Sequence, residues 1–116
     1  MKNSTDQAYL YDIQEAISKI DSYTVAGKES FLESALIQDA VIRNLEVIGE
    51  ATKRLKQETK DATPHIPWRR VAGLRDILIH DYARVDCEAV WNVVEEHLPS
   101  LRLTVASLLQ DYLKAP

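Results

Sequence analysis

The chain of 116 residues has little of what marks disulfide-bonded, membrane-spanning or secreted proteins. Its one cysteine, Cys87, excludes an internal disulfide framework and favours a reducing compartment, where a small packing role explains it best. No apolar run approaches the roughly 20 residues that a membrane span needs. The first seven residues have no apolar signal-peptide core. We therefore expect a cytoplasmic protein with no membrane partner.

A general excess of positive charge is also missing. The net charge is −4 and the isoelectric point is near 5.3, whereas a protein that coats nucleic acid needs a surplus of Lys and Arg. Any action on RNA must then depend on a small basic site. The segment 67–84 is one candidate because its arginines outnumber its aspartates. These residues are Arg69, Arg70, Arg75 and Arg84 against Asp76 and Asp81.

Helical periodicity dominates the first half of the chain. Apolar residues recur at three- and four-residue spacing, first at Leu10, Ile13, Ile17 and Ile20. Ser30 followed by Glu33 resembles a capping box and predicts a long helix from there nearly to Lys60. Such a helix has about 30 residues and a length of roughly 45 Å. A rod of that length predicts packing against a second subunit.

The second half also reads as helices, because no segment alternates with period two. Two prolines, Pro64 and Pro67, end the long helix. Asp86 is a plausible N-cap, and Leu98-Pro99 predicts a kink or a restart at the last helix. Between them runs another helical stripe, interrupted by Gly73: Trp68, Val71, Leu74, Ile77 and Leu78. The sequence predicts a single domain over residues 1–116, an all-α, up-and-down bundle of four to five helices.

The segment 75–82 gathers the side chains with the most chemistry. Arg75 can clamp a phosphate, and His80 can exchange a proton near neutral pH. On an ideal helix Arg75 and Tyr82 share a face, as do Asp76 and His80, but Arg75 and His80 diverge by about 140°. Two explanations stay open. Either the helix ends near Ile79 and frees His80, or a second subunit completes the site.

A polar stripe in the expected long helix is the second feature. Arg43, Glu46 and Glu50 are spaced at i, i+3 and i+7, and Gly49 stands among them. Glycine costs about 1 kcal/mol relative to alanine in a helix interior. It indicates close approach by another helix or a ligand, or it is incidental in a solvated face. The sequence alone leaves both readings open.

No other pattern predicts a cofactor or a metal. His65 lies in the proline-flanked loop and His97 near a helix end, and with Cys87 they form no metal-ligand spacing. Phosphate-binding and dinucleotide-binding glycine motifs and a nucleophile elbow are missing from the sequence.

Taken together, the motifs resemble a known family. In order they are Arg43-x-x-Glu46-x-x-Gly49-Glu50-Ala51, Ile66-Pro67-Trp68, Gly73-Leu74-Arg75, His80-x-Tyr82, Val90-Trp91 and Leu98-Pro99. This set, spread over about residues 39–101, resembles the HEPN superfamily. It is most similar to the small HEPN toxins, HepT-like proteins, that are paired with minimal nucleotidyltransferase antitoxins.

The resemblance implies a homodimer with a cleft between protomers, in which Arg75 and His80 cleave RNA without a metal. Asp76 is expected to assist, either by orienting His80 or by pairing with an arginine. The 2′-hydroxyl is required, so DNA is not a substrate. The family further implies that the cognate antitoxin transfers AMP from ATP to Tyr82. Arg43, Glu46, Gly49 and Glu50 would then line the cleft or the dimer interface.

Two other functions remain possible on the sequence alone. The chain could be a non-catalytic module that binds a nucleotide or a partner nucleotidyltransferase, with Arg75 holding phosphate without any cleavage. It could also be a plain dimeric scaffold. The acidic isoelectric point favours these two, whereas the ordered motifs favour the ribonuclease.

Overall fold

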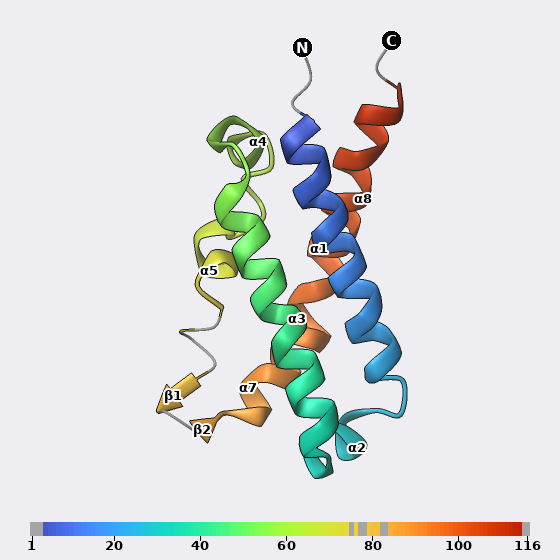
Figure 1. Ribbon diagram of the computed structural model, residues 1–116, viewed down its shortest axis with the longest axis vertical. Helices are drawn as coiled ribbons and strands as arrows, with labels where there is room; N and C mark the ends of the chain where they lie inside the picture. Colours follow the sequence, from blue (N-terminus) through green and yellow to red (C-terminus); the bar gives the residue numbers. More distant parts are fainter. Residues whose placement is uncertain (1–3, 75, 77–78, 82–83, 115–116) are drawn as a thin grey trace.

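Three long helices form the body of the protein: α1 (Ser4–Tyr23), α3 (Ala35–Arg54) and α8 (Leu98–Lys114). The computed structural model describes residues 4–74, 76, 79–81 and 84–114. α1 packs along both α3 and α8. α1 runs away from the end where the chain begins, whereas α3 and α8 both run towards it, so both termini lie at the same end (Figure 1). The molecule is elongated, 48 × 27 × 21 Å. The predicted all-α, up-and-down bundle is confirmed.

The core lies between these helices. The stripe predicted for α1 is buried as expected, with Leu10, Ile13 and Ile20 fully covered and Ile17 only 2% exposed. α3 contributes Val41, Leu45 and Ile48, and α8 contributes Leu98, Leu101, Val105 and Leu109. These apolar stripes hold the helices in register, because burying them is the main favourable term in folding.

The prediction of one helix from Ser30 to Lys60 is wrong at its start. A short helix, α2 (Lys28–Glu33), ends before Ser34, and α3 begins after it. Ser34 is extended, and its side chain accepts a hydrogen bond from the Ile37 amide at 3.1 Å. The side-chain amide of Gln38 donates from Nε2 to the carbonyls of Phe31 and Leu32 at the end of α2. These bonds satisfy groups that a helix end leaves unpaired, so the chain can turn here.

The same prediction is wrong at its end. α3 stops at Arg54, and a separate short helix, α4 (Gln57–Asp61), follows. The buried carboxylate of Asp6 accepts hydrogen bonds from the Lys56 amide at 3.2 Å and from the Thr59 hydroxyl at 2.6 Å. α3 is therefore 20 residues long, about 30 Å. The argument for a second subunit from the length of this helix no longer applies, and the homodimer stays a prediction.

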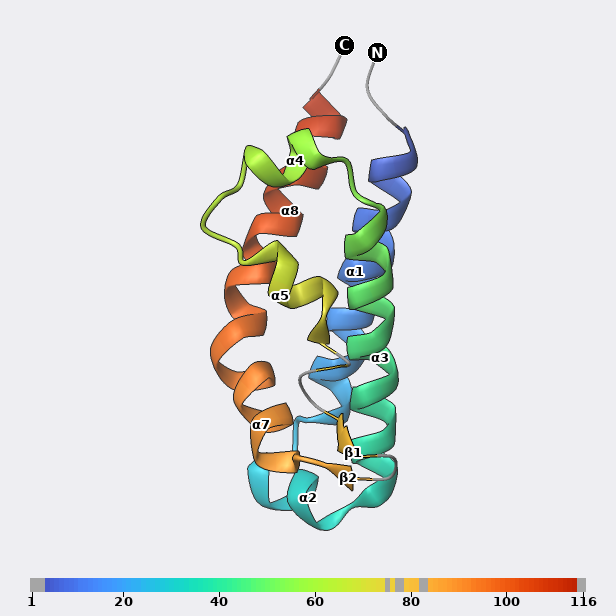
Figure 2. The same ribbon diagram turned by 90° about the vertical axis from the view of Figure 1, so that its left-hand side faces the viewer.

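The C-terminal half returns along the bundle through shorter pieces. α5 (Trp68–Ala72) is followed later by α7 (Cys87–Asn92), and Asp86 caps α7 as predicted, accepting from the Ala89 amide at 3.0 Å. A π-helix, η1 (Val93–His97), joins α7 to α8 (Figure 2). The predicted restart at Leu98-Pro99 is confirmed. Pro99 has no amide hydrogen, which breaks the regular α-helical bonding at this point.

Two short strands stand where only helix was expected. β1 (Ile79–Asp81) pairs antiparallel with β2 (Arg84–Val85), with Ile79 opposite Val85 and Asp81 opposite Arg84. The register shifts between Ile79 and Asp81. The β-branched residues Ile79 and Val85 favour this extended pairing. Within the described residues, no helix is long and apolar enough to cross a membrane.

Candidate active-site cleft

The structure agrees with the first explanation for His80, in which the helix ends before it. α5 ends at Ala72, and the amide of Asp76 donates to the carbonyl of Gly73 at 3.0 Å. By Ile79 the backbone is a strand, so His80 follows the helical part of the chain rather than continuing it. Angles calculated for one ideal helix therefore do not apply. The faces expected to be shared by Arg75 with Tyr82 and by Asp76 with His80 involve side chains outside the described residues, so they stay predictions.

Three of the predicted functional groups fall outside what the structure describes. Arg75 and Tyr82 are not among the described residues, and of His80 only the backbone is described. Asp76 is described and exposed. The catalytic roles of Arg75, His80 and Asp76 and the modification of Tyr82 therefore stay predictions.

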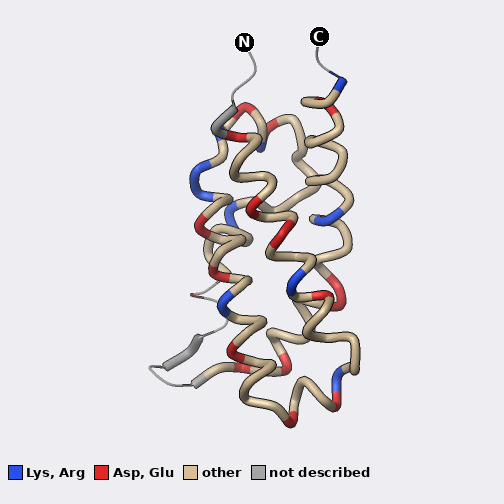
Figure 3. Tube along the Cα trace, turned by 45° about the vertical axis from the view of Figure 1, so that its right-hand side comes forward, with Lys and Arg blue, Asp and Glu red and all other residues tan. Residues whose placement is uncertain are grey.

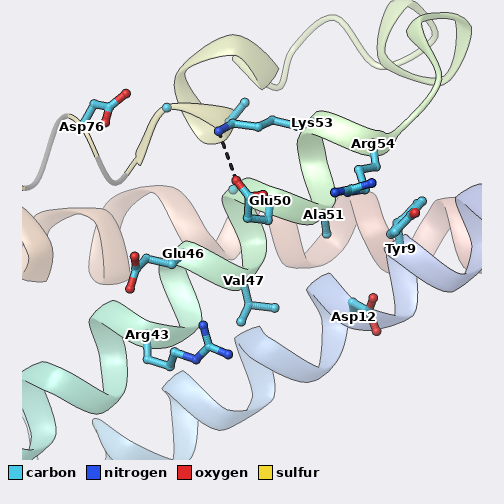
Figure 4. Close-up of a pocket in the computed structure, with 13 residues that line it drawn as sticks. Tyr9, Asp12, Arg43, Glu46, Val47, Glu50, Ala51, Lys53, Arg54 and Asp76 are labelled. Carbon is cyan, nitrogen blue, oxygen red and sulfur yellow. Dashed lines mark hydrogen bonds and ion pairs between the residues drawn. The ribbon is translucent and has the colours of Figure 1, made fainter.

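Asp76 lies at a surface hollow that also contains the polar stripe of α3. We call it the α3 hollow; its volume is about 510 Å³. Figure 4 shows side chains from α1, from α3 and from the segment after α5 around it. Its lining is Tyr9, Asp12, Arg43, Glu46, Val47, Gly49, Glu50, Ala51, Lys53, Arg54, Ala72, Gly73 and Asp76. The polar stripe of α3 and Asp76, which comes 26 residues after Glu50 in the chain, thus line one hollow.

The charges in the α3 hollow are mixed. Among the described residues its lining has four carboxylates, Asp12, Glu46, Glu50 and Asp76, and three cations, Arg43, Lys53 and Arg54. Lys53 Nζ lies 3.1 Å from Glu50 Oε2, but both side chains are more than half exposed, so this ion pair contributes little to stability. A lining of this kind does not attract a polyanion by charge alone.

Gly49 explains how α5 can lie so close to α3. A Cβ atom built on Gly49 would be 3.2 Å from the carbonyl oxygen of Ala72 and 3.3 Å from that of Val71. Gly49 therefore allows the close approach of α5, and the interpretation of an incidental glycine in a solvated face is wrong. This contact sets the position of the end of α5, from which the chain continues to Asp76.

Sequence reasoning missed four polar residues of the α3 hollow: Tyr9, Asp12, Lys53 and Arg54. Lys53 could have been found, because positions 43, 46, 50 and 53 continue one spacing along the face of α3. Tyr9 and Asp12 come from α1. No local pattern identifies them, since their place depends on how α1 packs against α3.

The remaining reactive side chains have structural explanations. His65 Nε2 lies 2.9 Å from the hydroxyl of Thr104, and His97 ends η1 at the surface. Burial raises the pKa of the Cys87 thiol, and the nearby carboxylates of Asp86 and Glu88 raise it further. Such a thiol is a poor nucleophile near neutral pH. In the described part of the chain no three His, Cys, Asp or Glu side chains gather as metal ligands would.

A family model described as Ribonuclease HepT-like matches residues 13–108. The chain belongs to the HepT-like family. This match covers the α3 stripe and the whole segment 75–82. Membership supports a nuclease role with RNA as substrate, and it confirms the resemblance drawn from the ordered motifs.

Individual relatives agree with this HepT-like assignment. A protein of Thermococcus cleftensis named "Probable ribonuclease HepT" is 47% identical over 95 residues, which are 81% of this chain and 86% of the relative. A "Putative RNase" of Methanocaldococcus jannaschii is 38% identical over 106 residues, 90% of this chain and 88% of the relative.

A longer relative from the same archaeon is named "Gamma-glutamylcyclotransferase and putative RNase". It is 41% identical over 104 residues, 89% of this chain, which spans only 47% of that relative's length. No solved structure matches the chain significantly.

Proposed function

We propose that this HepT-like protein is a metal-independent endoribonuclease, the toxin of a two-gene toxin–antitoxin module. Its catalytic residues are Arg75, His80 and Asp76, of which Asp76 lines the α3 hollow, and it works as a homodimer. A cognate minimal nucleotidyltransferase neutralises it by AMPylation of Tyr82. The observation that carries the proposal is the α3 hollow, where Asp76 of the segment 75–82 lies with Arg43, Glu46 and Glu50.

The reaction is a transesterification within RNA. His80 removes the proton from a ribose 2′-hydroxyl, whose oxygen attacks the adjacent phosphorus. A bond forms between phosphorus and the 2′-oxygen, and the bond from phosphorus to the 5′-oxygen breaks. An acid returns a proton to the departing 5′-oxygen, which leaves a 2′,3′-cyclic phosphate and a 5′-hydroxyl. An imidazole side chain can act as the base and as the acid that these two proton transfers require near neutral pH.

Arg75 is assigned to the phosphate. Its guanidinium can bind two phosphate oxygens at once and stabilise the charge that grows on them in the transition state. The acid is assigned to His80 of a second protomer, since a symmetric dimer brings two copies of the same residue to one interface.

Tyr82 is assigned a regulatory role. Its phenolic oxygen would attack the α-phosphorus of ATP held by the nucleotidyltransferase, and pyrophosphate would leave. Each added AMP brings a phosphate anion into the same segment as Arg75, where it competes with RNA for the guanidinium. The nucleotide also occupies space that the substrate needs.

The direct test replaces Arg75 and His80 by alanine, one at a time. Each substitution is expected to lower the rate of RNA cleavage by at least about 100-fold. General acid–base catalysis by His80 contributes roughly that much or more, and loss of a group such as Arg75 that stabilises transition-state charge costs about as much. His97→Ala is the matched control, because His97 is exposed on η1 and away from the α3 hollow. Folding of each variant is checked by circular dichroism. Undiminished cleavage by both folded variants overturns the assignment.

The regulatory role has its own test. The protein is purified with and without the nucleotidyltransferase, and intact masses are compared. We expect a gain in units of AMP that disappears in Tyr82→Phe but persists in Tyr23→Phe, whose tyrosine lies at the far end of α1. A mass gain that survives Tyr82→Phe places the modification elsewhere.

A further inference from the structure

RNA must be held by a part of the protein that carries net positive charge, and the α3 hollow does not. The chain as a whole is acidic, but its cations are unevenly distributed. Six of its 14 Lys and Arg residues lie between positions 53 and 70, against two of its 18 Asp and Glu residues. Figure 3 shows several blue segments, with red ones between them, in the part of the molecule where the C-terminal end of α3, α4 and α5 lie.

A second hollow lies in this stretch, and we call it the basic groove. Its volume is about 530 Å³, and its charged lining is Lys53, Lys60, Arg69 and Asp61. It shares Lys53 and Ala72 with the α3 hollow, so the two hollows adjoin along the C-terminal end of α3. A chain that occupies one can therefore continue directly into the other.

The cations of the basic groove are available to a ligand. Within the described residues, neither Lys60 nor Arg69 forms an ion pair or a side-chain hydrogen bond. The carboxylate of Asp61 accepts a hydrogen bond from the side-chain amide of Gln57 at 2.9 Å. Lys53 pairs with Glu50 in an exposed contact, which a phosphate can replace at little cost.

Among the described residues that line it, the groove offers cations for a phosphate backbone but no exposed aromatic ring for stacking bases. Trp68 lines it, yet its side chain is buried, and its indole Nε1 donates to the Thr63 hydroxyl at 2.9 Å. Proteins that read single-stranded RNA by sequence stack bases on exposed aromatic rings. A groove of Lys and Arg without such a ring contacts phosphates and is indifferent to sequence.

We propose that the basic groove binds the phosphate backbone of single-stranded RNA next to the scissile bond, through Lys60 and Arg69 with Lys53 at the junction. This inference rests on the proposed ribonuclease function. It gives an acidic protein a way to hold a polyanion. It also places the affinity for RNA outside the residues that perform the chemistry.

The first experiment measures binding without cleavage. A fluorescent single-stranded RNA of about 20 nucleotides is titrated with His80→Ala and with His80→Ala carrying Lys60→Ala and Arg69→Ala. We expect at least about tenfold weaker binding and a salt dependence reduced by roughly 1.4 in the logarithmic slope, since each phosphate contact on a single strand contributes about 0.7. Lys19→Ala with Lys114→Ala is the control, because it removes the same charge from exposed sites elsewhere.

The second experiment separates this groove from the catalytic site. Lys60→Ala/Arg69→Ala in the otherwise wild-type protein should cleave a dinucleotide at the wild-type rate, but lower kcat/KM for the 20-nucleotide RNA about tenfold. An equal effect on both substrates, or binding no weaker than in the control, overturns the groove. If the wild type binds RNA through these residues but cleaves neither substrate, the groove is supported and the proposed ribonuclease function fails instead.

Discussion

Gly49 of α3 touches the backbone of α5: a Cβ atom on it would lie 3.2 Å from the carbonyl oxygen of Ala72. Ala72 is the last residue of α5, and the chain continues from it through Gly73 to Asp76. The absence of a side chain at Gly49 therefore lets the end of α5 lie close to α3. It also explains why a helix tolerates a residue with such low helix propensity at this position.

Gly49→Val is expected to destabilise the protein by about 2 kcal/mol, because the added methyl groups meet backbone carbonyls that cannot move aside without shifting α5. Ser107→Val, at an exposed position of α8, is the control for the poor helix propensity of valine. Urea denaturation measures both. Equal stability of the two variants contradicts the close contact. RNA cleavage should fall in Gly49→Val even at temperatures where it stays folded.

The buried carboxylate of Asp6 joins the start of α1 to the turn between α3 and α4. It is 1% exposed and accepts from the Lys56 amide and the Thr59 hydroxyl. Asp6→Ala should lower the free energy of unfolding by about 2 kcal/mol, since two donors lose their partner. Thr59→Val should cost about 1 kcal/mol. Asp12→Ala, exposed on the same helix, should change stability by less than about 0.5 kcal/mol.

The thiol of Cys87 should react slowly with alkylating reagents near neutral pH. Its ionisation at high pH should slightly lower the stability of the folded protein. Burial raises the pKa of its thiol, with Asp86 and Glu88 adding to the shift. The folded protein then keeps the proton at a pH where the unfolded chain has lost it. The stability associated with this group is complete below the unfolded pKa and is lost as the pH rises through the folded pKa.

The measurement is the rate of alkylation by iodoacetamide as a function of pH. In the folded protein the midpoint should lie above that of the urea-unfolded chain. Glu88→Gln should lower the folded midpoint only in part, because burial is the larger cause. A folded midpoint at or below the unfolded one would contradict this account.

Local patterns predicted the parts of the fold that local physics determines. The apolar stripe of α1, the Asp86 cap and the restart at Leu98-Pro99 each depend on residues within one or two helical turns. The break at Ser34 did not follow from periodicity, since apolar spacing continues across it. The break is made by hydrogen bonds from Gln38 back to α2, which a stripe does not reveal.

For the candidate site as well, local patterns identified the individual residues but not the long-range contact that brings them together. Arg43, Glu46, Gly49 and Glu50 were found from their spacing on one face, and Asp76 from its place in the segment 75–82. Their meeting depends on α5 packing against α3, a long-range contact. The strand at Ile79–Asp81 was missed because three residues are too few to show alternation.

The most direct test of the central claim is the chemistry of the cut ends. The wild-type protein is incubated in EDTA with an RNA and with the same RNA carrying one 2′-deoxy nucleotide at the cut site. We predict products with a 2′,3′-cyclic phosphate and a 5′-hydroxyl from the first, and no cleavage at that position in the second. Products with a 3′-hydroxyl and a 5′-phosphate, or cleavage at the deoxy position, would contradict attack by the 2′-hydroxyl and the roles given to Arg75 and His80.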